Sequence, residues 1–297
     1  MMARKRRRHW PVVKSVLIYL AALFLLIETL APMVWMVISS ISPSVDLLSS
    51  PPHWIPQQPT FDRYLSILSS AEVGFRGSMV EGPAGAFLQG LLNSLIVATT
   101  TMIVGLVLGL LAAFAFARLR FRFSTSLLMG IMALQMLPAI ATVVPLFALF
   151  QRIHLTDTLA ALILTNSGIA VTYIIWVMTA YVRALPVELE DAARIDGTSH
   201  FGAYLRISLP LAIPGIVASG TLSFLNAWNE FLFALVMSFT PAAKTMPVVI
   251  SEFSTRFGLD YGMMMTGGVL ASIPPVLIAA FFQRYLVQGL SAGAVKG

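Results

Sequence analysis

The sequence predicts an all-α integral membrane protein with six transmembrane helices. Of its 297 residues, 58% are hydrophobic and only 11% are charged, whereas soluble domains carry about 25% charged residues. The mean hydropathy is +0.85. Apolar runs recur along the chain, and each supplies the roughly 20 residues that a helix needs to cross a bilayer. This composition excludes a large soluble core.

The chain opens with a basic segment, residues 1–14, that holds six of the 19 Lys and Arg residues. Such a cluster ahead of an apolar run is typical of a signal peptide, a nucleic-acid patch or a cytoplasmic anchor. The run over residues 15–40 is too long for a signal peptide and lacks a clear Ala-x-Ala exit. We therefore expect a basic cytoplasmic tail and an uncleaved first span. Glu28 inside that span either serves function or pairs with a neighbouring helix.

Residues 41–87 are rich in Pro and Gly, which predicts an external loop without a core of its own. A core transmembrane domain is expected over residues 88–286, followed by a cytoplasmic tail, residues 287–297. Gly105 and Gly109 form a GxxxG pattern that would let two helices pack closely. Five further spans are predicted near residues 88–117, 125–150, 158–182, 209–238 and 262–286.

The distribution of Lys and Arg predicts the topology. Six spans put both termini on one side of the membrane, together with the loops after the second and fourth spans. That side holds 14 of the 19 basic residues. Because basic residues concentrate in cytoplasmic loops, we expect both termini to be cytoplasmic.

The longest polar interruption in the second half runs from Pro186 to Pro214. Helical spacing places Leu189, Ala192 and Ala193 on one face, and acidic residues in the first turn suit the positive end of the helix dipole. Gly197 can adopt a positive φ and so end this helix. A second amphipathic piece follows, so the stretch is expected to form a helix-turn-helix between two spans.

This stretch resembles the EAA loop of ABC-importer permeases. The family pattern appears as Asp191-Ala192-Ala193, Gly197 and Ile207-Ser208-Leu209-Pro210, with every spacing kept. Asp191 stands where the family usually has Glu, so the side chain is one methylene shorter. The resemblance implies the type I importer permease fold with a cytoplasmic coupling helix. It implies contact with an ATPase through ten residues: Glu188, Glu190, Asp191, Ala192, Ala193, Asp196, Gly197, Ile207, Leu209 and Pro210.

Other segments extend the resemblance over nearly the whole chain. The HWIPQQPTFDRY segment is similar to the first external loop of carbohydrate-importer permeases, and Asn93-Ser94-Leu95 to the start of their conserved domain. The terminus, Gln288–Gly297, resembles that of the maltose-permease type. The implied assembly lies in a bacterial or archaeal cell membrane, in contact with lipid. It contains a second homologous permease, an ATP-binding subunit dimer and an external solute-binding protein.

A polar cluster inside the fifth predicted span is a candidate for the translocation path. Asn226, Trp228, Asn229 and Glu230 could bind sugar hydroxyl groups and stack on a sugar ring. At 1.5 Å per residue from Pro210, they would lie ~24–30 Å along the span, in its outer half. The alternative interpretation is an interfacial Trp with helix–helix amide contacts.

No catalytic, cofactor or metal site is predicted on this chain. The sequence contains no Walker A motif and no His/Cys cluster with metal-binding spacing, and it has no cysteine. ATP and Mg²⁺ are therefore expected on partner ATPase subunits. The basic charge is explained by topology, so no nucleic-acid partner is predicted. A secondary transporter or a membrane scaffold is the alternative function, although only Glu28 and Glu230 are acids within predicted spans.

Overall fold

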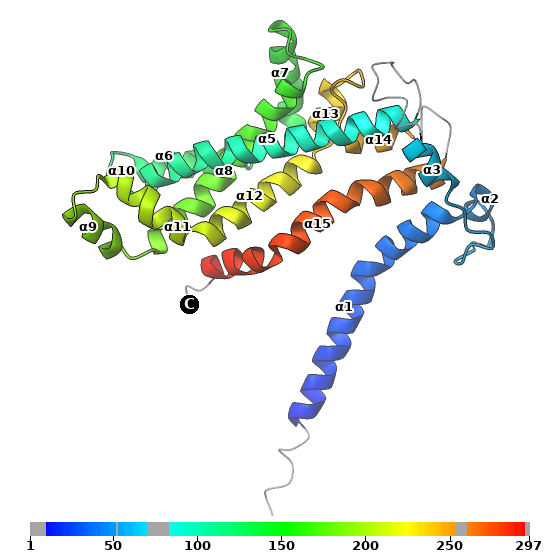
Figure 1. Ribbon diagram of the computed structural model, residues 1–297, viewed down its shortest axis with the longest axis horizontal. Coiled ribbons are helices and arrows are strands. Elements are labelled where there is room, and N and C mark those ends of the chain that lie inside the picture. The colour runs from blue at the N-terminus through cyan, green and yellow to red at the C-terminus, as the bar shows by residue number, and fades with distance from the viewer. Residues whose placement is uncertain (1–9, 52, 70–82, 254–259, 295–297) are drawn as a thin grey trace, which may run out of the picture.

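The computed structural model describes residues 10–51, 53–69, 83–253 and 260–294, and these residues form helices and connecting turns without a strand. Figure 1 shows a bundle of long helices from which α1 diverges. The first half contains α1 (Trp10–Ile41), α2 (Ser44–Leu47), α3 (Asp62–Ser69), α5 (Pro83–Arg118), α6 (Ser124–Leu134) and α7 (Ala139–Arg152). The second half contains α8 (Leu159–Ala184), α9 (Glu188–Ile195), α10 (His200–Ala203), η1 (Tyr204–Ser208), α11 (Leu209–Leu211), α12 (Ile213–Trp228), α13 (Leu232–Met237), α14 (Met246–Glu252) and α15 (Tyr261–Ala294).

Four described helices are long and apolar enough to cross a membrane as single rods: α1, α5, α8 and α15. Two further apolar segments are broken pairs, so the total reaches six if each pair counts as one span. The helices α6 and α7 meet at 91°, and residues 200–211 meet α12 at 77°. The all-α, multi-span fold class is therefore confirmed.

The spans predicted near residues 125–150 and 209–238 are not single helices in the structure. In the first, Pro138 lies at the break and cannot donate a backbone hydrogen bond to the preceding turn. In the second, α12 ends at Trp228, and the carboxylate of Glu230 starts a separate short helix, α13. The ends also differ, because α5 begins at Pro83 and α15 continues to Ala294, into the predicted tail.

The bundle is built on α5, which packs along α8 and α12. At Gly105, an added Cβ atom would lie 3.1 Å from the Cβ atom of Ala170, and at Gly109 it would overlap the side chain of Ile174. Any larger residue at these two positions would push the helices apart. The GxxxG prediction is therefore confirmed as a helix-packing face.

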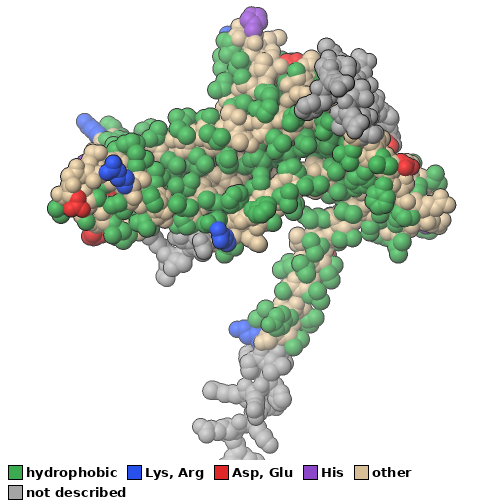
Figure 2. All heavy atoms as spheres, viewed as in Figure 1, with side chains coloured by type: hydrophobic (Ala, Val, Ile, Leu, Met, Phe, Trp, Pro, Cys, Tyr) green, Lys and Arg blue, Asp and Glu red, His purple; other side chains and the backbone are tan. Residues whose placement is uncertain are grey.

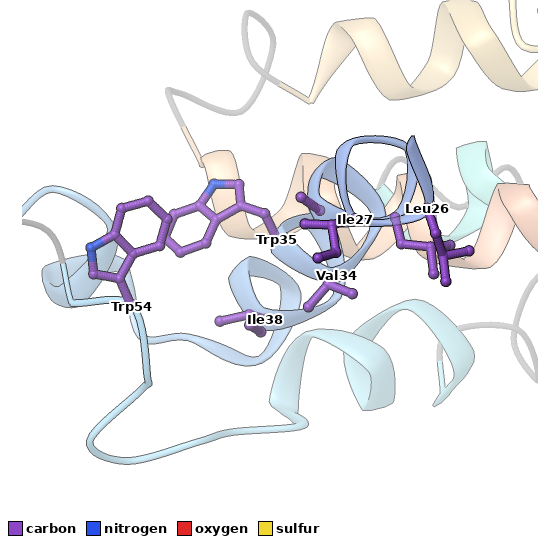
Figure 3. Close-up of a pocket in the computed structure, with 8 residues that line it drawn as sticks. Leu26, Ile27, Val34, Trp35, Ile38 and Trp54 are labelled. Atoms are coloured by element: carbon purple, nitrogen blue, oxygen red, sulfur yellow. The ribbon is translucent and has the colours of Figure 1, made fainter. Parts of the chain in front are cut away.

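The helix α1 contacts the bundle at its C-terminal end, where it packs on α15. Figure 3 shows Trp35 of α1 lying against Trp54 of the following loop, with ring centroids 4.9 Å apart. Arg63 of α3 donates to the Ser42 carbonyl over 2.7 Å, and the Ser40 and Tyr64 hydroxyl groups are 2.6 Å apart. The loop after α1 therefore fastens this end of the helix.

The surface of the bundle is apolar over most of its length. Figure 2 shows hydrophobic side chains covering most of the long helices, with several charged side chains at the end that carries α9 and Asp or Glu side chains toward the opposite end. Figure 1 places α9 and the C-terminal end of α15 at that end, and α2, α3 and α14 at the other. This distribution fits a bundle that crosses a membrane along its long axis.

Candidate functional site

The candidate site is the loop between α8 and α12, residues 186–214, which we call the coupling loop. Its first helix, α9, has Glu188, Glu190 and Asp191 in the first turn, where carboxylates favour the helix dipole. The helix ends before Gly197, which has φ +91°. Backbone N–H groups of Gly197 and Thr198 donate to the carbonyls of the last turn over 3.0 Å. The predicted glycine-ended helix is therefore confirmed.

The second half of the coupling loop runs through α10, η1 and α11. The Ser199 hydroxyl accepts from the Gly202 N–H over 3.1 Å and caps the start of this segment. Tyr204 is buried, and its hydroxyl donates to the Leu110 carbonyl of α5 over 2.9 Å. Its ring lies 4.7 Å from that of Phe114. An aromatic side chain thus fixes this half of the loop to α5.

A buried ion pair fixes the first half of the loop to the same helix. The Nε atom of Arg118 lies 2.7 Å from Oε1 of Glu190, and the two side chains are 8% and 7% exposed. The hydroxyl of Ser208 donates to the same carboxylate. The Nη2 atom of Arg118 also donates to the Leu185 carbonyl over 3.4 Å. Sequence reasoning missed Arg118, because no local pattern links two residues so far apart.

The outer face of α9 is open and carries apolar side chains among charged ones. Leu189 is 45% exposed and Ile195 is 87% exposed, and Ala192 beside them is exposed too. Asp191 pairs with Arg194 over 2.9 Å at the surface. Contiguous exposed apolar patches are typical of protein–protein or membrane contacts. Because Ala192 is small, a partner backbone could approach this face closely.

The other predicted coupling residues divide between surface and interior. Glu188, Asp196 and Pro210 are exposed, and Ala193, Ile207 and Leu209 are partly buried. Glu190 differs from the rest, because its carboxylate points into the bundle and not toward an open surface. We therefore assign Glu190 to holding the loop in place.

The polar cluster predicted to line a path is split by the structure. Glu230 accepts backbone hydrogen bonds from Phe233 over 2.7 Å and from Ala234 over 3.0 Å, so it caps α13. Trp228 is 3% exposed and stacks on Phe224. Asn226 and Asn229 are exposed. The sequence carried a signal for this cap, because Glu230 is an acidic residue directly before an apolar run, a typical start of a helix.

The opposite end of the bundle is tied together by polar side chains. Asp157, between α7 and α8, accepts from the N–H groups of Phe239 and Thr240 over 2.7 and 3.0 Å. Burial favours the neutral form of Asp157, but these bonds and the Thr240 hydroxyl outweigh it and lower the pKa of the carboxyl. Asn93 donates to the Lys244 carbonyl over 2.9 Å. These bonds hold the segment between α13 and α14 against α5 and α8.

Within the described part of the chain, no three His, Asp or Glu side chains gather closely enough to hold a metal ion. The coupling loop is thus an anchored segment with one open face. A loop of this kind also occurs in a known protein family. The family described as "binding-protein-dependent transport system inner membrane component" matches residues 105–292, which include the whole coupling loop.

The chain belongs to this family. As an inner-membrane transport component it is a permease of an ABC importer and not itself an enzyme. It is similar to the trehalose transport system permease protein SugB of Mycobacterium tuberculosis, with 34% identity over 298 residues and 100% of both chains covered. It is also similar to the trehalose/maltose transport system permease protein MalG of Thermococcus litoralis, with 31% identity over 96% of this chain and 98% of the relative.

Among solved structures, the permease is similar to a chain of a bacterial ABC transporter involved in the import of the acidic polysaccharide alginate. The TM-score is 0.73 with 18% identity, and 96% of this chain and 99% of the other are covered. A likeness at this identity shows the fold, which is that of the ABC importer permeases. The predicted family and fold are thus confirmed, whereas the roles of individual loop residues remain predictions.

Proposed function

We propose that this permease is the transmembrane subunit of an ATP-driven importer for a carbohydrate, and that it forms half of the translocation path. The observation that carries the proposal is the coupling loop, which leaves Leu189, Ala192 and Ile195 open while a buried ion pair fixes it to α5. Relatives named for trehalose and for trehalose/maltose transport support the substrate class.

The coupling loop receives an ATPase subunit on the face formed by Leu189, Ala192 and Ile195. ATP and Mg²⁺ bind to the ATPase dimer, which closes and moves the docked helix. Because Glu190 and Tyr204 both bond to α5, this movement reaches a spanning helix through short contacts. A loop held only by flexible contacts would absorb the movement.

The remaining partners occupy the membrane and the outer side. A second, homologous permease supplies the other half of the path and covers apolar helix surface that this chain leaves open. An external solute-binding protein delivers the carbohydrate at the end carrying α3 and α14. Both termini and the coupling loop lie in the cytoplasm, and lipid surrounds the rest of the bundle.

The test is reconstitution of the permease with its partner permease, ATPase and binding protein in proteoliposomes. We expect uptake of a neutral sugar that requires both internal ATP and the binding protein. Uptake driven by an ion gradient without ATP would indicate a secondary transporter instead. An assembly that forms but moves no solute under either condition would indicate a scaffold.

A further inference from the structure

The bend between α6 and α7 leaves an irregular stretch of backbone beside the middle of α8. The side chain of Gln135, just after α6, donates to the Ile169 carbonyl of α8 over 3.1 Å. At 1.5 Å per residue, Ile169 lies about 15 Å from the outer end of α8 and about 22 Å from its inner end. The break is therefore near the middle of the membrane.

Irregular backbone at this depth needs a polar environment. The N–H groups of residues 135–137 donate to carbonyls three residues back and not four, so the α-helical pattern ends here. Residues 135–138 are all exposed. In hydrocarbon each unpaired backbone group costs free energy, so such breaks occur only inside protein or beside a water-filled cavity. Broken helices at the midplane also mark substrate sites in secondary transporters.

A hollow of about 660 Å³ lies at this break, between α6, α7 and α8. We call it the bend hollow. Figure 1 shows α7 leaving the direction of the long helices. Its volume falls within the range of small-molecule sites. The side chains used below are Gln135, Thr142, Thr165, Gly168, Thr172 and Phe233, all of which line it.

The lining of the bend hollow is uncharged and presents hydrogen-bond acceptors. The hydroxyl groups of Thr142, Thr165 and Thr172 donate to carbonyls of their own helices over 2.9–3.0 Å. Each oxygen keeps lone pairs free to accept. Sugar hydroxyl groups are matching donors, and an apolar wall that includes Phe233 suits the CH face of a sugar ring. A charged solute would find no opposite charge on these walls.

We propose that the bend hollow is the part of this permease that binds the carbohydrate during translocation, and that it is filled with water when the sugar is absent. The proposal rests on the function proposed above and places the sugar contact here and not at Asn226 and Asn229. The capping bond of Glu230 supports this site indirectly, because it fixes Phe233 at the wall.

The chain contains no cysteine, so single introduced cysteines can test whether the bend hollow is filled with water. Thr142→Cys, Thr172→Cys and, as a control, Val107→Cys are made in the full complex and treated with a charged, water-soluble methanethiosulfonate. Val107 is 54% exposed on α5 and does not line the hollow. We expect the two threonine positions to react about tenfold faster or more, because the thiolate forms in water and not in lipid.

Sugar protection is measured on the same variants with saturating trehalose and, separately, maltose. Slower reaction at Thr172→Cys with either sugar supports the proposal. Reaction that both sugars leave unchanged overturns the sugar site, and reaction as slow as at Val107→Cys overturns the water-filled hollow. Failure of the proposed function has a different signature: a wild-type complex with no ATP-dependent uptake of either sugar.

Substitutions at two glycines test whether sugar transport needs the free volume of the bend hollow. A Cβ atom added at Gly168 or at Gly130 meets nothing within 4 Å, but only Gly168 lines the bend hollow. We expect Gly168→Leu to lower uptake about tenfold or more in a complex that still captures its ATPase, and Gly130→Leu to keep wild-type uptake. Equal uptake by the two variants contradicts the proposal.

Discussion

The side chain of Arg118, the last residue of α5, donates to the carboxylate of Glu190 in α9 over 2.7 Å. The same carboxylate accepts from Ser208 of η1, and the same guanidinium reaches the Leu185 carbonyl after α8. Four segments of the permease therefore meet at one buried ion pair. Because both side chains are removed from water, neither can rotate away without leaving a buried charge unpaired.

Replacing Gly197 with Val should uncouple the ATPase while leaving the spans inserted. The φ of +91° is strained for a β-branched residue by roughly 1–2 kcal/mol, and nothing lies within 4 Å of an added Cβ atom, so the effect is conformational. Gly197→Asn is the control, because Asn tolerates positive φ. The measurements are sugar uptake, ATPase capture and stimulation of ATPase activity by loaded binding protein. Wild-type values of all three in Gly197→Val would refute this account of the turn.

Replacing Glu230 with Ala should destabilise the permease by about 0.5–2 kcal/mol through loss of the α13 cap. Glu230→Gln keeps an acceptor oxygen and should retain most of the stability. Trp228→Ala should cost more, about 3–5 kcal/mol, because the ring is buried. Thermal unfolding in detergent checks this order. If Glu230 contacts substrate instead, both Glu230 variants will lose uptake at unchanged stability.

The Asp157 contacts should make part of the stability depend on pH. The folded pKa lies below the ordinary value of 3.8, so the stabilisation is present at neutral pH and is lost as the pH falls through the folded pKa. Asp157→Asn should therefore lower the unfolding temperature at pH 7 and make less difference near pH 3. The exposed coupling-loop substitution Asp196→Asn is the control. A penalty for Asp157→Asn that stays constant across this range would argue against the charged acceptor.

Single cysteines should report the orientation in the membrane. Ala242→Cys, in the exposed turn between α13 and α14, should react in intact cells with an impermeant maleimide, whereas Ile195→Cys in α9 should react only after the cells are opened. Labelling of Ile195→Cys but not of Ala242→Cys in intact cells would contradict the topology predicted from Lys and Arg.

Features set by local chemistry were predictable from the sequence. Gly197 lies where a helix must end and the chain must turn, and only a residue that tolerates positive φ fits there. Gly105 and Gly109 indicated a close helix contact because small residues at that spacing share a face. The apolar runs indicated the spans because the bilayer fixes the length of each.

Features set by tertiary contacts were not predictable. A count of apolar residues does not show that α6 and α7 meet at 91°, because both halves are equally apolar. The partner of Glu190 lies 72 residues away, so helical spacing could not reveal the ion pair, and the resemblance placed Glu190 among the ATPase-contacting residues. Glu230 was predicted to line a path because the apolar run continues past it, so hydropathy did not separate α12 from α13. The backbone N–H groups that Glu230 binds belong to α13.

The central claim is that the coupling loop transmits ATPase closure to α5 through Arg118 and Glu190. It is tested most directly by measuring sugar imported per ATP hydrolysed in proteoliposomes with Arg118→Glu, Glu190→Arg and the double reversal. The exposed Arg122→Gln, outside the coupling loop, is the surface control. We predict that each single reversal lowers this ratio sharply while the ATPase stays bound, and that the double reversal restores part of it. Single reversals that assemble normally and import as much sugar per ATP as the wild type would contradict the account.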